Sequence, residues 1–502
     1  MMAQVGALPT WKTIDWTTVE EHVRRLQIRI AKAVKTKKYG KVKALQWLLT
    51  HSRYAKLLAI KRVTGNQGGK TAGVDKVIWT TPEDKMRAVE SLKRRGYKAQ
   101  PLRRIYIPKK RGSNKQRPLS IPTMVDRAQQ ALYLLSLEPI VESVADRNAY
   151  GFRQKRCAAD AIEQCMLSLW QKGSAEWIFE GDIQECFNDI SHRWLLANVP
   201  IDKVMLVQWL KAGYIYKGSY SPTIAGTPQG GIISPALLLI TLQGLEEAVL
   251  QAISKRKDKV HVISFADDFI ITGATKEVLI EKVTPVVKSF LAERGLTLSE
   301  SKTKITHIKE GFDFLGLTIR KYKDKVLSTP SKASRKSFYA NLRKVVKSNK
   351  SAKTENLIRM LNPRILGWGN YFRFSAAKRI FESMGYQIFR LLWRWIHSRH
   401  SRKSSKWRIK RYFRSRGEEH WVFTAKIFND KKKEAEYLDL VRMSKILIRR
   451  HIKIRGSANP YDPQYSEYFQ LREQEKRRGN AIISDAVPYN NFLALLDQEH
   501  WS

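Results

Sequence analysis

Residues 260–271 read VHVISFADDFII, so that two adjacent aspartates, Asp267 and Asp268, interrupt a run of β-branched and aromatic residues. Such residues favour β-strands, and the polar break predicts a hairpin whose turn carries both carboxylates. In an ordinary loop an Asp-Asp pair is usually just a favoured turn sequence. Here the apolar flanks predict poorly hydrated surroundings, in which adjacent negative charges raise each other's pKa unless a cation neutralises them. The stretch therefore predicts a metal site at a strand turn.

A third carboxylate extends this site. Residues 177–181 form a predicted apolar strand that ends at Asp182, and two such strands can lie side by side in one sheet. Three converging carboxylates suit two Mg²⁺ ions about 4 Å apart, one activating a 3′-hydroxyl and the other holding a triphosphate. The pattern indicates nucleotidyl transfer, with Asp182, Asp267 and Asp268 as catalytic and metal-binding residues.

The charge balance indicates the partner. The 502-residue chain has 92 Lys+Arg and 46 Asp+Glu, a formal net charge of +46. Neutralising phosphates releases condensed counterions, which gives such a chain sequence-independent affinity for nucleic acid. A membrane surface is the alternative, but the basic segments lack an amphipathic anchor pattern, and the longest apolar run, residues 236–240, is far too short to span a bilayer. We expect a nucleic-acid partner and no membrane association.

The remaining chain divides into several predicted parts. Apolar residues recur at helical spacing over residues 23–34 and 42–49, with a break at Tyr39-Gly40, and predict two basic N-terminal helices. Residues 102–122 alternate as a two-stranded hairpin with a basic tip. After about residue 325 the pattern is helical and basic, and a mixed-charge segment follows from about Glu418.

Two other features of the sequence do not indicate a functional site, although their composition suggests one. Residues 64–75 contain Gly-Lys-Thr, but the first glycine of a phosphate-binding loop is replaced by Thr64 and no apolar strand precedes it. The three cysteines, Cys157, Cys165 and Cys186, lack the paired spacing of a zinc site and are too few to cross-link the chain. With no signal-peptide pattern at the N-terminus, we expect a cytoplasmic protein.

The motifs around the aspartates resemble those of reverse transcriptases in order and spacing. The similar segments are GDI (181–183) with Phe187, TPQGGIISP (227–235), FADD (265–268), LSESKT (298–303) and FDFLG (312–316), the last resembling the primer grip. RIYIPK (104–109), RPLSIP (117–122) and Asp126-Arg127 resemble the fingers of group II intron enzymes, and LNPRILGWGNYF (361–372) resembles their maturase domain. Phe265 departs from the commoner Tyr but keeps the ring.

This resemblance to bacterial group II intron-encoded reverse transcriptase/maturases, of the chloroplast-like type, implies an α+β fold. We expect a right-hand polymerase, with fingers and a palm of antiparallel sheet and helices, a helical thumb or maturase domain X, and a small DNA-binding domain. The expected bounds are an N-terminal basic helical extension at 1–60, fingers at 61–175, palm at 176–325, domain X at 326–420 and DNA-binding domain at 421–502.

The resemblance also implies roles for single residues. Lys109 and Arg117 would grip the triphosphate, with solvated surface charge as the alternative. Phe187 would exclude a 2′-hydroxyl, with core packing as its main competitor, and Gln229 would contact the nucleotide or template. Lys302 would also bind the nucleotide, and the Ile183 carbonyl would assist the two Mg²⁺ ions.

A basic, aromatic-rich stretch follows. Residues 383–417 contain no acidic residue and predict an RNA-binding surface, although helical spacing favours burial for about half of its aromatics. The predicted RNA-binding residues are Arg390, Arg394, Arg399, Arg402, Lys403, Lys406, Arg408, Lys410 and Arg411.

The C-terminal stretches RRHIK (449–453) and ANPYD (458–462) resemble the segment that leads into an HNH endonuclease in many relatives. The chain has no cysteine after Cys186, and we expect this nuclease to be absent or truncated.

We therefore expect an RNA-directed DNA polymerase that copies group II intron RNA by target-primed synthesis and promotes splicing and retrohoming. Its partners would be intron RNA, target DNA and dNTPs, in a nucleoid-associated ribonucleoprotein that contains it as a monomer or dimer. Two alternatives are a maturase-only splicing cofactor and a reverse transcriptase of the CRISPR or diversity-generating type. The three aspartates argue against the first alternative, and residues 361–372 argue against the second.

Overall fold

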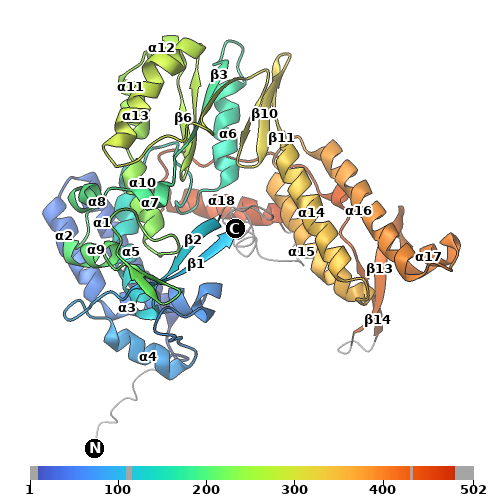
Figure 1. The fold of residues 1–502 in the computed structure, drawn as a ribbon, viewed down its shortest axis with the longest axis horizontal. Helices are drawn as coiled ribbons and strands as arrows, with labels where there is room; N and C mark the ends of the chain where they lie inside the picture. Colours follow the sequence, from blue (N-terminus) through green and yellow to red (C-terminus); the bar gives the residue numbers. More distant parts are fainter. Residues whose placement is uncertain (1–9, 109–115, 430–433, 481–502) are drawn as a thin grey trace, which may run out of the picture.

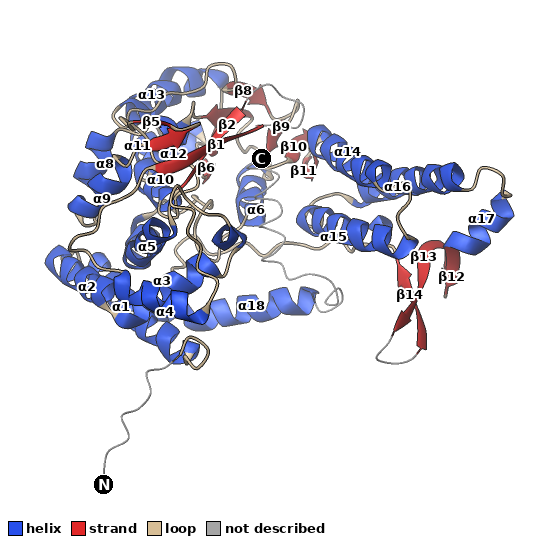
Figure 2. Ribbon diagram, turned by 60° about the horizontal axis from the view of Figure 1, so that its bottom comes forward, coloured by secondary structure: helices blue, strands red, loops and turns tan. Residues whose placement is uncertain are grey.

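The computed structural model describes residues 10–108, 116–429 and 434–480. A helical lobe, a central region of strands and an elongated helical arm follow one another across the molecule (Figure 1). Figure 2, coloured by secondary structure, shows short strands between clusters of helices. The predicted α+β class is confirmed. Within the described ranges, no helix is long and apolar enough to cross a membrane.

The N-terminal lobe is built around a central helix that is buried along most of its length. Its helices are α1 (Trp16–Lys35), α2 (Tyr39–His51), α3 (Arg53–Thr64), α4 (Pro82–Ser91) and the central α5 (Met124–Val144). The carboxylate of Asp15 caps α1 by accepting hydrogen bonds from the backbone NH groups of Thr17 and Thr18. The two predicted helices are confirmed, but the chain breaks at residues 36–38, and Gly40 lies inside α2.

The predicted hairpin at residues 102–122 is also present. β1 (Leu102–Pro108) pairs antiparallel with β2 (Gln116–Ile121) and parallel with β4 (Tyr214–Tyr216), which pairs with β5 (Ser219–Ser221). The basic tip of the hairpin, including Lys109, lies outside the described residues.

A second four-stranded sheet, in the order β6-β7-β3-β8, forms the centre of the molecule. Its strands are β3 (Trp177–Asp182), β6 (Val262–Phe265), β7 (Asp268–Gly273) and β8 (Lys304–His307). The sheet separates two cores, because alternate side chains of each strand point to opposite faces. Phe179 and Phe269 belong to the core shared with the N-terminal lobe, whereas Ile178 and Ile270 belong to the core shared with the arm.

Further helices precede and connect the strands of this sheet, and α6 and α11 contact β6. They are α6 (Ala158–Leu169), α7 (Cys186–Asp189), α8 (His192–Asn198), α9 (Lys203–Leu210), α10 (Ser234–Leu242), α11 (Leu245–Gln251), α12 (Lys255–Asp258), the π-helical turn η2 (Val278–Val283) and α13 (Thr284–Ala292); a short 3₁₀ turn, η1 (Gln67–Lys70), lies in the N-terminal lobe.

A three-stranded sheet joins the central sheet to the arm. It consists of β9 (Phe312–Phe314), β10 (Leu317–Tyr322) and β11 (Lys325–Pro330). The helical arm contains α14 (Lys332–Ser348), α15 (Thr354–Phe372), α16 (Lys378–Arg399) and α17 (Ser405–Tyr412). Its helices pack around Trp368, whose ring stacks on Phe338 at a centroid distance of 4.7 Å.

A further sheet at the end of the arm was not predicted. It contains β12 (Phe413–Arg416), β13 (Glu419–Asn429) and β14 (Glu434–Asp439). The mixed charges of this segment concealed the strand pattern. Asp439 accepts hydrogen bonds from the guanidinium of Arg414 at 2.9 Å and also pairs with Arg416 at 3.3 Å, so these charges link β14 with β12, the two outer strands of the sheet.

After β14 the chain returns to the N-terminal half as a segment that we call the C-terminal strap, residues 449–480. It follows the 3₁₀ turn η3 (Met443–Lys445) and contains η4 (Pro463–Tyr465) and α18 (Ser466–Asn480). Arg24 of α1 donates a hydrogen bond to the carbonyl of Pro460, and Lys35 pairs with Asp462. The strap therefore contacts the first helix of the chain.

One buried carboxylate holds the strap in place. Asp160, at the start of α6, is 0% exposed. Its Oδ1 accepts hydrogen bonds from His451 Nε2 at 2.9 Å, the backbone NH of Ile454 at 2.8 Å and Arg472 Nη2 at 2.6 Å. Its other oxygen accepts from the backbone NH of Cys157 at 2.9 Å. Burial opposes ionisation, but the hydrogen bond and charge of His451 and the charge of Arg472 outweigh it and hold the pKa of Asp160 below its usual value.

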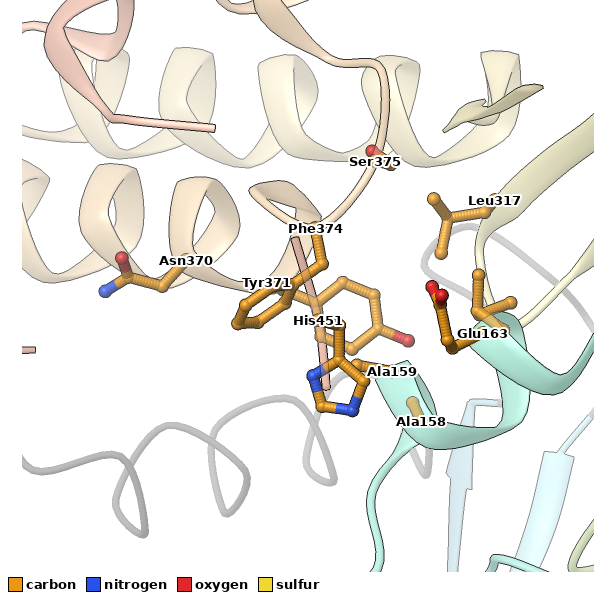
Figure 3. Close-up of a pocket in the computed structure, with 10 residues that line it drawn as sticks. Ala158, Ala159, Glu163, Leu317, Asn370, Tyr371, Phe374, Ser375 and His451 are labelled. Atoms are coloured by element: carbon orange, nitrogen blue, oxygen red, sulfur yellow. The ribbon is translucent and has the colours of Figure 1, made fainter. Parts of the chain in front are cut away.

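The ligand atoms of Cys157, Asp160 and His451 lie within 4.8 Å of one another, as in a metal site. The surroundings do not favour a divalent metal ion. Arg472 already forms an ion pair with Asp160, and burial raises the pKa of the Cys157 thiol to about 11, which disfavours the thiolate that binds metals. The group is better described as an ionic latch. Beside it, Tyr371, Leu317, Glu163 and His451 line a cavity of about 30 Å³ (Figure 3), which has room for one or two water molecules.

We predict that Asp160→Asn lowers the free energy of unfolding by about 3 kcal/mol, because it leaves the buried guanidinium of Arg472 without its anion. The carboxylate's pKa is lowered by folding, so its stabilisation is present above its unfolded value of 3.8 and is lost as the pH falls below it. Urea unfolding at pH 7 and at about pH 2.5 measures both effects. Glu473→Gln, which removes the exposed Lys155–Glu473 pair of the same strap, is the matched control, and equal stability of the two variants would contradict the latch.

Candidate functional site: a carboxylate cluster on the central sheet

The two aspartates of the FADD motif sit at the tightest turn of the central sheet. β6 ends at Phe265 and β7 begins at Asp268, and these two residues pair with each other. Ala266 and Asp267 are thus the two residues of a hairpin loop. Ala266 has φ +58°, a left-handed conformation that reverses the chain over this short distance. The predicted hairpin is confirmed, and it directs both carboxylates to the same end of the sheet.

Strand pairing brings the third carboxylate beside them. β3 pairs antiparallel with β7, and Asp182 lies directly opposite Asp268. Directly opposed residues of antiparallel strands have Cα atoms about 4.5–5.5 Å apart. The structure therefore brings Asp182 together with Asp267 and Asp268, which lie 85 and 86 positions later in the sequence.

The carboxylates of this cluster carry like charges and lie close together, so each disfavours the ionisation of the others. Desolvation by the surrounding protein, followed by the charges of Asp267 and Asp182, raises the pKa of Asp268 to about 7. Desolvation also raises the pKa of Asp267, and Asp182 adds to the effect. The carboxyl of Asp268 still reaches solvent, so an ion can approach it.

Two cations counter this negative charge. Lys302 Nζ donates a hydrogen bond to Asp182 Oδ2 at 2.8 Å, and the charge of Arg117 on β2 favours the ionised form of Asp267. The backbone of Asp182 is held as well, because its carbonyl accepts a hydrogen bond from the NH of Ser299 at 2.8 Å. Of the basic residues predicted to bind the nucleotide, Arg117 and Lys302 lie at the cluster, while Lys109 falls outside the described residues.

Phe187 and Gln229 lie near the cluster, where hydrogen bonds connect the TPQGG segment with α7 and β2. Phe187 is 6% exposed on α7, and its carbonyl accepts a hydrogen bond from the NH of Thr227 at 2.6 Å. The carbonyl of Gln229 accepts one from the NH of Ser120 at 2.8 Å, so the TPQGG segment bridges α7 and β2. The burial of Phe187 agrees with core packing, and a steric-gate role stays a prediction. Ile183 is 4% exposed, just after Asp182.

The donor set fits a hard divalent cation. Its ligands are carboxylate oxygens, which Mg²⁺, Mn²⁺ and Ca²⁺ prefer over nitrogen or sulfur, and the raised pKa of Asp268 shows that a nearby positive charge would relieve repulsion. In the described part of the chain, the ligand oxygens of the three aspartates do not all approach within 4.8 Å of one another.

The predicted RNA-binding residues fall on the outer half of the helical arm and divide into two groups. The exposed side chains are Arg390, Arg394, Arg402, Lys403, Lys406, Lys410 and Arg411. Arg408 is 6% exposed and donates hydrogen bonds to the carbonyls of His400 at 2.9 Å and Ser401 at 3.0 Å, where it caps the end of α16. Arg399 is partly buried and bonds the Lys350 carbonyl at 3.3 Å.

The aromatics of this region behave mainly as core. Trp395, Tyr412 and Phe413 are buried, and Trp393 is partly buried, whereas Trp407 is 36% exposed. The expectation that about half of the aromatics would be buried is confirmed.

Sequence patterns did not reveal two groups of polar residues. The latch around Asp160 joins positions almost 300 residues apart, and nothing local marks them. Glu180, on the face of β3 that carries Asp182, could have been found from the two-residue spacing that places alternate side chains together.

Three parts of the chain match models of known protein families. Residues 107–319 match the model of reverse transcriptase (RNA-dependent DNA polymerase), residues 11–92 match the N-terminal domain of reverse transcriptase, and residues 335–413 match the maturase-specific domain of group II introns. The first match contains all three aspartates, and the third contains most of the arm.

Several characterised or named proteins are similar in sequence. Group II intron-encoded protein LtrA of Lactococcus lactis subsp. cremoris is 31% identical over 329 residues, 52% of this chain and 54% of LtrA. Protein YkfC of Escherichia coli (strain K12) is 31% identical over 372 residues, 64% of this chain and 95% of YkfC. An uncharacterized 91 kDa protein in the cob intron of Schizosaccharomyces pombe is 28% identical over 333 residues, 54% of this chain and 41% of that protein.

The carboxylate cluster, the fold and these matches define a protein with a reverse transcriptase domain, and such a fold implies a divalent metal cofactor. The chain belongs to the family of group II intron-encoded proteins, which join this domain to a maturase-specific domain. Its match spans about half the length of LtrA, 54%.

We predict that divalent cations stabilise the protein more at pH 8 than at pH 6. The pKa of Asp268 is about 7 without a metal, so an ion that binds below this pH must displace a proton, and its affinity falls by up to about tenfold per pH unit. Thermal melts with and without MgCl₂ at pH 6, 7 and 8 measure the difference. Asp268→Asn should abolish this pH dependence, and an equal Mg²⁺-induced shift at all three values in the unaltered protein would contradict the prediction.

Proposed function

We propose that this protein is an RNA-directed DNA polymerase that copies group II intron RNA by target-primed synthesis, and that it also acts as a maturase in splicing and intron mobility. The observation that carries the first part is the pairing of Asp182 with Asp268 beside Asp267. Few reactions other than metal-dependent phosphoryl transfer call for three carboxylates crowded at one sheet end. The match of residues 335–413 supports the second part.

In this proposal Asp182, Asp267 and Asp268, with the Ile183 carbonyl, hold two Mg²⁺ ions. These ions would supply activation of the primer 3′-hydroxyl and neutralise the triphosphate. Arg117, whose charge already acts on Asp267, binds and orients the triphosphate together with Lys109. Lys302 releases Asp182 as the nucleotide enters and pairs with phosphate oxygens instead, because its side chain is 67% exposed and flexible enough to move.

Phe187 and Gln229 would select and position the substrate. The ring of Phe187 packs edge-on against Phe152 at a centroid distance of 6.4 Å, and this rigid pair would leave no room for a 2′-hydroxyl and so favour dNTPs. Gln229 is held by its backbone to β2, so its side chain is placed to contact the nucleotide or template. We assign the fingers to residues 61–175 and the palm to residues 176–325.

We assign domain X to residues 326–420 and a DNA-binding domain to residues 421–502. The exposed cations of the arm would bind intron RNA through its phosphates, and Arg408 would act only by supporting α16. The arm and the carboxylate cluster lie on different elements, α16 and α17 against β3 and β7. RNA binding and DNA synthesis should therefore be separable by mutation.

We predict that Asp267→Ala combined with Asp268→Ala lowers cDNA synthesis by on the order of a thousandfold or more, because the ligands for the reacting groups are lost. Splicing of the intron RNA should stay near the level of the unaltered protein. Primer extension on an RNA template with Mg²⁺ and a splicing assay measure the two activities. Asp324→Asn, at an exposed turn, is the control, and a parallel loss of both activities would contradict a separate binding surface.

A second prediction concerns the arm. Replacing Arg394, Lys410 and Arg411 by Gln should weaken RNA binding and reduce the slope of log K against log [salt] by about 0.7–0.9 for each RNA phosphate that the variant no longer neutralises. Filter binding at several KCl concentrations measures the slope. A variant with Lys172→Gln, Arg193→Gln and Lys288→Gln, all exposed outside the arm, removes the same number of positive charges and controls for net charge. An unchanged slope in the arm variant would place the RNA elsewhere.

A further inference from the structure

A segment between α5 and α6 pairs with the outer edge of β6, the strand that ends at the FADD turn. β6 is an outer strand of the central sheet. The NH of Ser264 donates a hydrogen bond to the carbonyl of Asn148 at 3.0 Å, and its carbonyl accepts one from the NH of Tyr150 at 2.9 Å. Ala149 accordingly forms a parallel bridge with Ser264. We call residues 146–153 the backing segment.

Gly151 brings the backing segment against the turn itself. A Cβ at residue 151 would lie 2.3 Å from the backbone nitrogen of Ala266 and 2.9 Å from the carbonyl carbon of Phe265. Only a residue without a side chain allows two backbones to approach so closely. Ala266 is 7% exposed and directly precedes Asp267 and Asp268. A shift of the backbone at this contact would therefore move both carboxylates.

A buried ion pair fixes the end of the backing segment that follows Gly151. The guanidinium of Arg153 donates hydrogen bonds to both carboxylate oxygens of Glu142 on α5, at 2.9 and 2.6 Å. Its remaining terminal nitrogen donates to the carbonyls of Asp146 at 2.7 Å and Ala149 at 2.9 Å. The side chains of Arg153 and Glu142 are 2% and 5% exposed. One side chain thus holds the fold of the segment and attaches it to α5.

The other end of the backing segment is attached to α11. Asn148 Nδ2 donates a hydrogen bond to Glu246 Oε1 at 2.7 Å, and Asp146 Oδ1 accepts one from the NH of Gly244 at 2.9 Å. The segment is therefore held by two helices outside the sheet. It is a fixed support against which the FADD turn rests.

We propose that Gly151 is a positioning residue for DNA synthesis. Its missing side chain lets the backing segment hold Ala266, and with it the two aspartates that follow, where they can share metal ions with Asp182. External support is needed because the like charges of the carboxylates push the turn and β3 apart. The inference rests on the proposed polymerase function. Gly151 does not itself touch the reacting atoms, and it acts through the backbone of Ala266.

The experiment compares two variants of the full-length protein with matched controls. Gly151→Ala adds one methyl group at the contact, and Gly40→Ala adds the same group in α2, where a Cβ meets no atom within 4 Å. Arg153→Lys keeps the buried charge but cannot make the four hydrogen bonds of the guanidinium. Its control is Arg147→Lys, at an exposed position of the same segment.

Four quantities are measured for each variant. They are kcat of primer extension on an RNA template with Mg²⁺, the Kd of the annealed primer–template, the melting temperature without metal, and the Kd of Mn²⁺ for the protein alone. Mn²⁺ is suitable because it prefers the same oxygen ligands as Mg²⁺ and its free ion is counted by electron paramagnetic resonance. The last measurement reads the geometry of the carboxylates independently of activity.

We expect Gly151→Ala to lower kcat by on the order of tenfold to a hundredfold, as misplaced reacting groups do. Mn²⁺ binding should weaken by on the order of tenfold, as it does when the support of metal ligands is disturbed. Primer–template binding should be unchanged. Arg153→Lys should show the same two losses to a smaller degree. A merely structural role would instead lower the melting temperature and primer–template binding, with unchanged Mn²⁺ affinity in the folded protein.

Two results would overturn the inference. In the first, Gly151→Ala has the same kcat and the same Mn²⁺ affinity as Gly40→Ala. In the second, kcat falls while Mn²⁺ affinity stays at the control value, so that the carboxylates have not moved. If Gly151→Ala does not fold, Arg153→Lys and its control decide by the same criteria. Failure of the unaltered protein to extend the primer would refute the proposed polymerase function, and the Mn²⁺ measurement would still test the position of the turn.

Discussion

The antiparallel register between β3 and β7 is the constraint on which the site depends. It places Asp182 opposite Asp268, and a slip by one residue would turn Asp182 to the opposite face of the sheet. Gly181 helps to fix this register. A Cβ at residue 181 would lie 2.3 Å from the ring of Phe269 on the neighbouring strand, so that ring can pack over the glycine only in the observed alignment. The crowding of the carboxylates, and the need for a cation among them, follow from it.

Local sequence patterns were sufficient for the parts of the molecule that are built from neighbouring residues. The hairpin around Asp267, the strand before Asp182 and the hairpin at residues 102–122 were all predicted, because turn residues and apolar alternation mark them directly. The family motifs indicated that Asp182 and Asp268 lie close together in space. Their large separation in the sequence gives no sign of this. The β12–β14 sheet was missed because its strands carry paired charges. The role of Asp439 became clear only when the structure showed that it pairs with Arg414.

The same limit applies to single residues of the site. Basic composition could not distinguish Arg408, which is buried against the carbonyls of His400 and Ser401, from its exposed neighbours on α17. Nor could it show that Lys302 pairs with Asp182. The structure separates cations that support the fold from cations that can face a polyanion. This division is what allows one strongly basic chain to keep a carboxylate cluster on its sheet and a surface of exposed cations on its arm.

The strap has a consequence for the order in which the molecule is built. Arg472 and Asp160 are 312 positions apart, so during synthesis the carboxylate is made long before its guanidinium partner. Nascent domains generally fold from the N-terminus onward, and α6 must therefore wait with its anion uncovered until nearly the whole described chain has left the ribosome. The contacts of the strap with the first helix, from Arg24 to Pro460 and from Lys35 to Asp462, likewise join early residues to residues that are synthesised more than 400 positions later.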